Sequence, residues 1–120
     1  NAWVDKAVLP MLRARHADRQ SYQRRAVLLE ALAVLAGHMS VESFEGELLP
    51  LALSMADDRV PNLRLILANA LQRAAPQLST PTLAGRVVPA LEALTLDEDM
   101  DVLGAAREAL EVCLALAHGR

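Results

Sequence analysis

Four carboxylates in the last third of the chain have the spacing of a calcium-binding loop. Counted from the first, they fall at positions 1, 3, 5 and 12 of an EF-hand: Asp97, Asp99, Asp101 and Glu108. Such a loop also needs glycine at position 6 for its sharp turn, and this chain has Val102 there. Residues 102–113 continue an apolar pattern of helical period, which a calcium loop would interrupt. We therefore expect no calcium site, and expect these carboxylates to cap the N-terminus of a helix.

Histidine and cysteine, which carry much catalysis and metal binding, are few in this chain. The three histidines fall near the ends of expected helices, without a carboxylate or cysteine at ligand spacing: His16, His38 and His118. Cys113, the single cysteine, falls on the apolar face of an expected helix with no candidate base nearby. The residues therefore predict no catalytic site, no metal site, no cofactor and no internal disulfide.

Two arginines 39 residues apart, Arg25 and Arg64, stand near the expected beginnings of helices. A guanidinium group donates parallel hydrogen bonds to a carboxylate, so each arginine can bind a polar side chain of a neighbouring segment. The candidate partners lie in polar turns: Asp58, Asn62, Asp97 and Asp101. We expect a structural ladder of such contacts, ending where Leu103 replaces the next arginine. The alternative is that these residues contact a partner protein directly.

Apolar and aromatic residues stand in the same polar turns, where folding gains little from them. They are Tyr22, Val60, Pro61 and Met100, and Asp101 follows the last of them. Apolar side chains exposed on turns often mark a contact with another protein, and tyrosine is enriched at the centres of such contacts. Two interpretations remain open: these residues bind a partner, or their apolar groups pack onto their own helices as staples.

The overall composition favours helices. The chain has 120 residues and a mass of 13.0 kDa, which suits a single domain. Its 23 leucines and 22 alanines favour helix, whereas aromatic residues, which are common in strands, make up only 2%. Hydrophobic residues make up 53% and the net charge is only −3, which excludes a disordered chain.

Charge and hydropathy argue against two classes of partner. A pI of about 5.5 and the scarcity of aromatic residues argue against nucleic acid. No apolar run approaches the roughly 18 residues that span a bilayer, so we expect no membrane partner. The charge is unevenly distributed, since residues 1–40 carry +3 and residues 79–120 carry −4. Such an uneven charge can steer a partner of opposite polarity.

Signals recur along the chain at an interval of about 39 residues. An apolar pair with proline recurs at Pro10, Pro50 and Pro89, and an alanine–leucine pair recurs at Leu32, Leu71 and Leu110. Each unit predicts two antiparallel helices joined by a polar turn, and the units cover about 1–39, 40–78 and 79–120. The expected helices lie near 4–16, 23–37, 41–55, 61–75, 80–96 and 101–117.

One helix pair cannot bury both of its apolar faces, so the units must stack into an all-α solenoid of three repeats. The second helices carry the clearest faces, at helical spacing. In the second unit the face consists of Leu63, Leu67, Ala70, Leu71 and Ala74, and in the third of Val102, Ala106, Ala109, Leu110 and Cys113. Proline inside each first helix removes a backbone hydrogen bond and predicts a bend there.

The repeat resembles the HEAT family of helical repeats. The resemblance rests on a proline in the first helix, an aspartate in the turn and an arginine that opens the second helix. The residues are Pro50, Asp58, Val60, Asn62 and Arg64 in the second unit and Pro89, Asp97, Asp99, Asp101, Val102, Ala106 and Leu110 in the third. Three stretches are similar to the three C-terminal repeats of phosphatase 2A scaffold subunits: ADRQSYQRRAVLLEALAVLA, MADDRVPNLRLILANALQ and LEALTLDEDMDVLGAAREALEV. This resemblance implies six antiparallel helices in a right-handed stack.

The resemblance also implies a scaffold without catalytic activity. Such subunits hold the phosphatase catalytic subunit on the ridge formed by the turns within their C-terminal repeats. A regulatory subunit binds repeats nearer the N-terminus, which this chain does not contain. No small-molecule substrate is implied, and the implied location is the cytoplasm, with the nucleus as a second one. Trp3 stands where those subunits have a tryptophan, and the start at Asn1 rather than Met predicts a piece of a longer protein.

Two other functions fit the same repeat. One is a HEAT-repeat adaptor for another client, such as a type 4 phosphatase regulatory subunit or a transport receptor. The other is a metal-dependent HEAT-like enzyme, although the His-Glu pairs that bind metal in such enzymes do not occur in this sequence.

Overall fold

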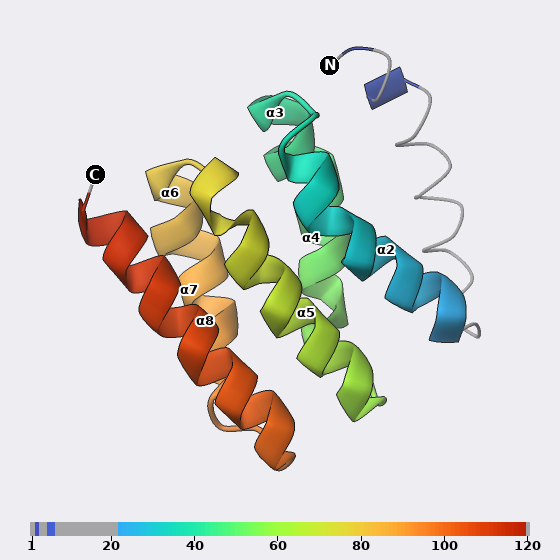
Figure 1. Cartoon of the computed structure of the whole chain (residues 1–120), viewed down its shortest axis with the longest axis vertical. Coiled ribbons are helices and arrows are strands. Elements are labelled where there is room, and N and C mark those ends of the chain that lie inside the picture. The colour runs from blue at the N-terminus through green and yellow to red at the C-terminus, as the bar shows by residue number, and fades with distance from the viewer. Residues whose placement is uncertain (1, 3–4, 7–21, 120) are drawn as a thin grey trace.

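The computed structural model describes residues 2, 5–6 and 22–119 of the chain (Figure 1). Every regular element within these residues is helical, which confirms the expected all-α class for this part of the chain. The expected helix at 4–16 falls outside them except at its residues 5 and 6. Three residues named from the sequence also lie outside the described part: Trp3, Pro10 and His16.

The helices follow the expected order, and their ends lie within a few residues of the expected ones. They are α2 (Tyr22–Ala36), α3 (Val41–Ser43), α4 (Leu49–Leu53), α5 (Pro61–Ala74), α6 (Thr80–Thr82), α7 (Val88–Leu94) and α8 (Met100–Gly119). Short 3-10 turns follow α4 at Ser54–Asp57 and α5 at Ala75–Gln77. We refer to α2 as the described part of the first unit, to α3–α5 as the second unit and to α6–α8 as the third.

The first helix of the second and third units is continuous but irregular, because a π-helical turn interrupts it. These turns are Phe44–Leu48, between α3 and α4, and Leu83–Val87, between α6 and α7. Each is followed by a helix with a proline, Pro50 or Pro89, at its second position. A proline cannot donate the usual bond and its ring crowds the carbonyl four residues earlier. A π-helical turn therefore precedes each of these prolines, while the bend expected at the prolines stays a prediction.

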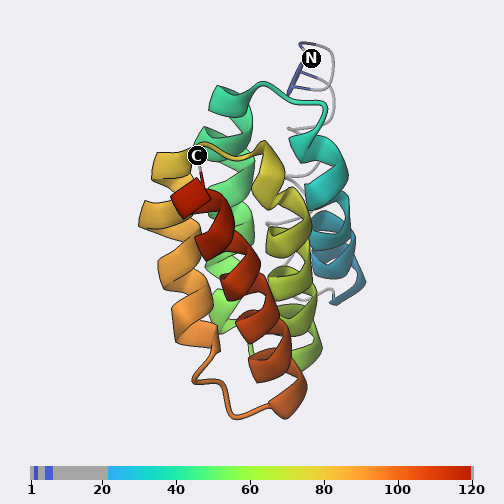
Figure 2. The ribbon, with the colours of Figure 1, turned by 60° about the vertical axis from the view of Figure 1, so that its left-hand side comes forward.

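The units form two layers (Figure 2). The second helices make one layer, in which α5 lies between α2 and α8 (Figure 1). The first helices, α3–α4 and α6–α7, make the other layer and run antiparallel to the second helix of their unit. The shortest dimension, 18 Å, matches two helix layers, since packed helices lie about 8–10 Å apart. This arrangement is compatible with an α-solenoid, while the number of repeats, their boundaries and the handedness remain predictions.

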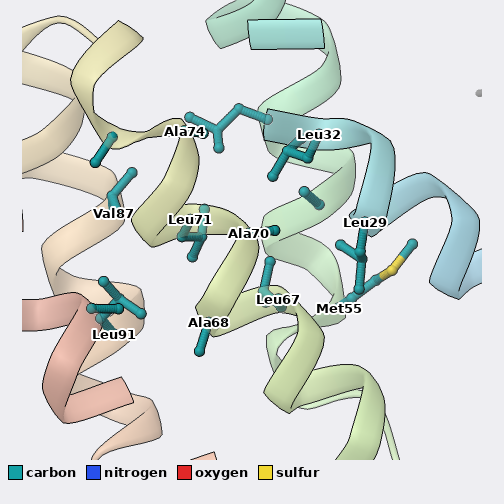
Figure 3. Close-up of a cluster of buried hydrophobic side chains, with 14 of the residues drawn as sticks. Leu29, Leu32, Met55, Leu67, Ala68, Ala70, Leu71, Ala74, Val87 and Leu91 are labelled. Carbon is teal, nitrogen blue, oxygen red and sulfur yellow. The ribbon is translucent and has the colours of Figure 1, made fainter. Parts of the chain in front are cut away.

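The core lies between these layers. Leucines from the second helices, Leu29, Leu32, Leu67 and Leu71, are 0% exposed and gather with Leu91 of α7 (Figure 3). Full burial of each such side chain stabilises the fold by about 1.5–3 kcal/mol relative to exposure. The clustering of one helical face from each second helix therefore holds adjacent units together.

The apolar faces predicted for α5 and α8 are buried, with one exception. All five residues expected on α5, and four of the five on α8, are buried. Leu110 of α8 is only half-buried. Among the described helices α8 has a neighbour in its layer on one side only, α5, whereas the equivalent Leu71 belongs to a helix flanked on both sides.

A bilayer-spanning helix must be both long and apolar. None of the helices in the described part of the chain meets both conditions.

Candidate protein-docking ridge

The beginnings of the three second helices lie along one edge of the molecule (Figure 1). Their first residues are Tyr22, Pro61 and Met100, which are spaced 39 residues apart and are all exposed. Tyr22 is 39% exposed and Met100 is 74% exposed. We define the turn ridge as six exposed residues of this edge, namely Tyr22, Pro61, Asn62, Leu96, Met100 and Asp101; the charged Arg59 and Glu98 of the same turns are also exposed.

Arg25 of α2 is held against Asp58, in the turn before α5. Its Nε lies 2.9 Å from Oδ2 of the aspartate and its Nη2 lies 3.4 Å from Oδ1. The two side chains are only 5% and 11% exposed. Oδ1 of Asp58 also accepts the backbone N–H of Val60 at 3.0 Å. The carboxylate therefore orders its own turn and joins that turn to the preceding unit.

Arg64 of α5 repeats this arrangement one unit later. Its Nε and Nη2 donate to Oδ2 and Oδ1 of Asp97 at 2.8 and 3.1 Å, a bidentate contact. Oδ1 of Asp97 accepts the N–H of Asp99 at 2.9 Å, as Asp58 does for its own turn. Arg64 Nη1 also donates to the backbone carbonyl of Asp58 at 2.6 Å. The contacts thus run without a break from α2 through the second turn to the third.

The second of these pairs shifts the pKa values of both partners in the direction that favours their charged forms. The hydrogen bond from Arg64 holds the pKa of Asp97 below its ordinary value, despite the opposing effect of burial. The same hydrogen bond raises the pKa of Arg64. Both groups are therefore charged at neutral pH, and loss of either would leave its partner as a half-buried charge without its counter-ion.

Asn62 and Asp101, expected as partners of the arginines, have other contacts. The Asn62 side-chain amide donates to the hydroxyl of Tyr22, so Asn62 joins two units without touching a guanidinium. The backbone N–H of Asp101 donates to Oδ1 of Asp99 at 2.9 Å, and the N–H of Val102 donates there at 3.1 Å. Asp99 thereby caps the beginning of α8, as expected for this carboxylate cluster.

Val60 differs from the other residues expected to bind a partner. It is half-buried and packs against the core, and it immediately precedes α5. The alternative interpretation, packing onto its own unit, therefore describes Val60 better than exposure to a partner does. Leu96 was not among the residues singled out from the sequence, yet it is 85% exposed in the turn after α7. The sequence pattern includes it in the expected helix at 80–96; its place next to Asp97, at the start of the polar turn, was the available signal.

A second set of contacts joins the units at the opposite ends of the helices, and the sequence pattern did not reveal it. Glu45 accepts Ser79 N–H at 2.7 Å, Ser79 Oγ–H at 2.9 Å and Thr82 Oγ1–H at 2.6 Å. Ser79 in turn caps α6 through the N–H of Thr82. One unit earlier, Ser40 caps α3 and donates to Oδ2 of Asp5 at 3.1 Å. We call these the linker contacts; the interval of 39 residues between the two serines was the signal that could have revealed them.

Two opposing effects act on the pKa of Glu45. Burial raises it, whereas hydrogen bonds from Thr82 and Ser79 and the charge of Arg86 lower it by more. The net pKa lies below the ordinary value, so Glu45 is ionised at neutral pH. Arg86 also donates from Nη1 to the Glu45 backbone carbonyl at 2.8 Å, which adds a further bond between the second and third units.

Comparison with known proteins gives partial matches. No family model matches the chain. Over 58 residues it is 50% identical to the A beta isoform of the human serine/threonine-protein phosphatase 2A 65 kDa regulatory subunit, which covers 48% of this chain and 10% of that protein. It is 29% identical over 103 residues to the A-type regulatory subunit of protein phosphatase PP2A from Saccharomyces cerevisiae, which covers 81% of this chain and 16% of that protein.

The chain resembles a part of the phosphatase 2A scaffold subunit. It spans only 10% and 16% of the lengths of these two relatives. Both relatives are named as regulatory subunits of a phosphatase rather than as catalytic ones.

Cys113 and two of the aspartates in the described part of the chain are buried or held in hydrogen bonds within the fold. Cys113 is fully buried, and this burial raises the pKa of its thiol to about 11, so the thiolate nucleophile is not formed at neutral pH. No group of three or more histidine, cysteine or acidic side chains among residues 2, 5–6 and 22–119 is arranged to hold a metal ion. Two carboxylates of the EF-hand-like spacing, Asp97 and Asp99, are used by Arg64 and by the first amides of α8.

Proposed function

We propose that this chain is a non-catalytic scaffold segment that binds the catalytic subunit of protein phosphatase 2A through its turn ridge. The observation that carries the proposal is the repetition of exposed residues at one edge. Tyr22, Pro61 and Met100 begin successive second helices at equal intervals in the sequence and lie along a common edge. The resemblance to phosphatase 2A scaffold subunits supports the choice of partner.

The contacts behind the ridge support this role because they keep its residues in place. The Arg25–Asp58 and Arg64–Asp97 pairs lie directly beneath the turns and tie each turn to the second helix of the preceding unit. A surface that is ordered before binding loses little conformational entropy when a partner docks. In this proposal the arginine pairs set the spacing of the ridge, and the exposed residues make the contact.

The composition of the ridge suits a protein partner. Tyr22 presents a large apolar ring with a polar end, and Met100 adapts its shape to irregular surfaces. Asp101 adds a charge beside Met100, as rim residues of interfaces do. We assign partner contact to Tyr22, Pro61, Met100 and Asp101, and assign Val60 to packing. A regulatory subunit would bind elsewhere on the full scaffold, and such a complex would work in the cytoplasm and the nucleus.

The test is binding of the purified chain to purified phosphatase 2A catalytic subunit. We expect saturable binding that Tyr22→Ala and Met100→Ala each weaken about tenfold, which is typical when an aromatic or apolar anchor of an interface is truncated. Helicity should stay unchanged in both variants. The melting temperature should stay unchanged for Met100→Ala, because Met100 is 74% exposed, and should fall only slightly for Tyr22→Ala, which loses the hydrogen bond from Asn62. Binding is measured by calorimetry, and folding by circular dichroism.

Val34→Ala is the matched control, because Val34 is 58% exposed near the other end of α2. It should bind like the unsubstituted chain. If the folded chain does not bind the catalytic subunit, the proposal fails and a different client becomes the better hypothesis. If the unsubstituted chain binds, and Tyr22→Ala and Met100→Ala bind with the same affinity as it does, the turn ridge is not the contact surface.

A further inference from the structure

The two junctions between adjacent units along the turn ridge differ in one respect. At the first junction, Tyr22 reaches across to Asn62 and its hydroxyl accepts a hydrogen bond from that amide. The residues 39 positions later, at the second junction, are Pro61 and Asp101. A proline ring is short and has no polar end, so it cannot make the equivalent bridge.

A hollow lies at this second junction. It has a volume of about 230 Å³ and is lined by Pro61, Asn62, Leu65, Asp99 and Asp101. A water molecule occupies roughly 30 Å³ in the liquid, so the hollow is large enough for a side chain of a partner. Its position between the beginnings of α5 and α8 places it on the ridge that we propose as the docking surface.

The walls of the hollow combine two kinds of chemistry. Pro61 and Leu65 come from α5 and supply apolar surface. Asp99, just before α8, and Asp101, in the first turn of α8, supply carboxylates. Arg64, which lies near the hollow, does not neutralise these two carboxylates, because it is paired with Asp97. The whole segment 79–120 carries seven acidic and three basic residues. A cation with an apolar stem complements these walls.

We propose that the hollow receives an arginine side chain of the protein that docks on the turn ridge. The stem of the arginine lies on Pro61 and Leu65, and its guanidinium faces the carboxylates of Asp99 and Asp101. Arginine suits the hollow better than lysine, because its planar group is weakly hydrated, packs on apolar surface and donates several hydrogen bonds at once. This inference rests on the proposed function, and it names the chemistry that the partner must bring to the third turn.

Apolar residues next to the hollow in sequence strengthen the case for a docked protein rather than a small cation. Met100, between the two lining aspartates, is 74% exposed, and Leu96 in the same turn is 85% exposed. Apolar side chains around a charged contact exclude water from it, and this exclusion strengthens the electrostatic interaction. A small ion would leave these two side chains in water.

The first test fills the hollow with a larger side chain of the protein itself. Pro61→Tyr places at the second junction the residue type that occupies the first one, at the same position in the helix. We expect the ring to occupy the hollow, to leave the melting temperature unchanged or higher, and to weaken binding to the phosphatase 2A catalytic subunit roughly tenfold, as loss of one anchor pocket does. Val34→Tyr, which adds the same ring far from the ridge, is the control and should bind normally.

The second test removes charge with little change of shape. Asp101→Asn should weaken binding roughly tenfold at low salt, and the affinity of this variant should fall less steeply with added salt than that of the unsubstituted chain. Glu111→Gln is the control, because Glu111 is exposed further along α8 and does not line the hollow. The backbone amide of Asp101, not its carboxylate, makes the cap to Asp99, so the fold should not change.

The outcomes separate this inference from the proposed function. Weaker binding of both hollow variants with normal binding of both controls supports the arginine pocket. If Tyr22→Ala weakens binding while Pro61→Tyr and Asp101→Asn bind normally, the pocket is wrong, and the docking surface is limited to the part of the turn ridge around Tyr22 and Met100. If the unsubstituted chain does not bind the catalytic subunit, both are overturned.

Discussion

The two ends of the helix pairs join adjacent units in different ways. At the turn ridge, a guanidinium group of one second helix binds the aspartate of the next turn, as in Arg25–Asp58 and Arg64–Asp97. At the linker end, the carboxylate of Glu45 accepts bonds from hydroxyl and amide groups that begin the next first helix. Both ends use a carboxylate, but the donors are charged at the ridge and neutral at the main linker contacts.

The difference agrees with the proposal that the turn ridge, and not the linker end, contacts a partner. The linker contacts combine with helix capping, because Ser79 caps α6 while it donates to Glu45. The arginine–aspartate pairs at the ridge lie beneath exposed residues, Tyr22 and Met100 among them. A change at the linker end should therefore affect stability alone. A change at the ridge end should affect stability or binding, depending on whether it touches the arginine pairs or the exposed residues above them.

The third unit has neither the arginine nor the glutamate with which the second unit contacts the unit after it. Leu103 stands where Arg64 does one unit earlier, and Ala84 stands where Glu45 does. The third unit thus carries neither the cation nor the carboxylate that the second unit offers to its successor. That the arginine ladder ends at Leu103 stays a prediction, made because no leucine side chain can donate a hydrogen bond.

The largest effect in this comparison is expected for Arg64→Ala. The change removes three donated bonds and leaves Asp97 as a nearly buried charge, so we expect a loss of about 2–3 kcal/mol in the free energy of unfolding. Urea unfolding followed by circular dichroism measures it. Arg73→Ala on the same helix is the control and should change stability by less than about 0.5 kcal/mol, because Arg73 is exposed. Equal losses in the two variants would contradict a structural role for the ladder.

A smaller effect is expected at the linker end, for Glu45→Gln. The glutamine keeps one acceptor oxygen but loses the charge that three donors share, so we expect about 1–2 kcal/mol lower stability at pH 7. Binding to the phosphatase catalytic subunit should not change. Because the pKa of Glu45 is lowered in the fold, its contribution is complete above the ordinary pKa and is lost as the pH falls through the lowered one.

The difference in stability between the chain and Glu45→Gln should therefore shrink as the pH falls from about 6 to about 3. Urea unfolding at several pH values measures this difference. Glu42→Gln, in the exposed first turn of α3, is the control and should lower stability by less. A difference that stays constant over this pH range would mean that the carboxylate of Glu45 does not couple the two units through its charge.

The smallest effect is expected for Tyr22→Phe. The phenylalanine keeps the ring on the ridge and removes only the hydroxyl that accepts from Asn62, so we expect a loss of about 0.5 kcal/mol. A double-mutant cycle with Asn62→Ala isolates this bond. Binding should be retained, in contrast to Tyr22→Ala. A loss as large as that of Arg64→Ala would make this bridge a structural rung equal to the arginine pairs.

Much of the helical architecture could be predicted from the sequence. The apolar faces of α5 and α8 follow a period of 3.6 residues. This period can be recognised within each helix alone, without knowledge of the rest of the chain. The interval of 39 residues likewise identified Arg25 and Arg64 as equivalent, and the structure places Asp58 and Asp97 against them. The number of HEAT repeats and the role of these pairs in stability stay predictions.

The candidate site was predicted less completely. Val60 was placed among turn residues that either bind a partner or pack onto their own helices, and it is half-buried against the core where α5 begins. Leu96 was expected at the end of a helix but protrudes from the turn, because α7 ends at Leu94. Both residues lie near the ends of helices, where one residue more or less changes the side on which a side chain lies.

The sequence by itself determined the helical class, the order of the helices and the faces that form the core, because each depends on residues that are neighbours along one helix. Tertiary structure decided which side chains meet across units, namely Tyr22 with Asn62 and Glu45 with Ser79 and Thr82. It also decided that a hollow stays open beside Pro61. These partners lie tens of residues apart. The way in which one helix pair stacks on the next determines which of these side chains come within hydrogen-bonding distance. A periodic sequence pattern does not give the distance between residues of different units.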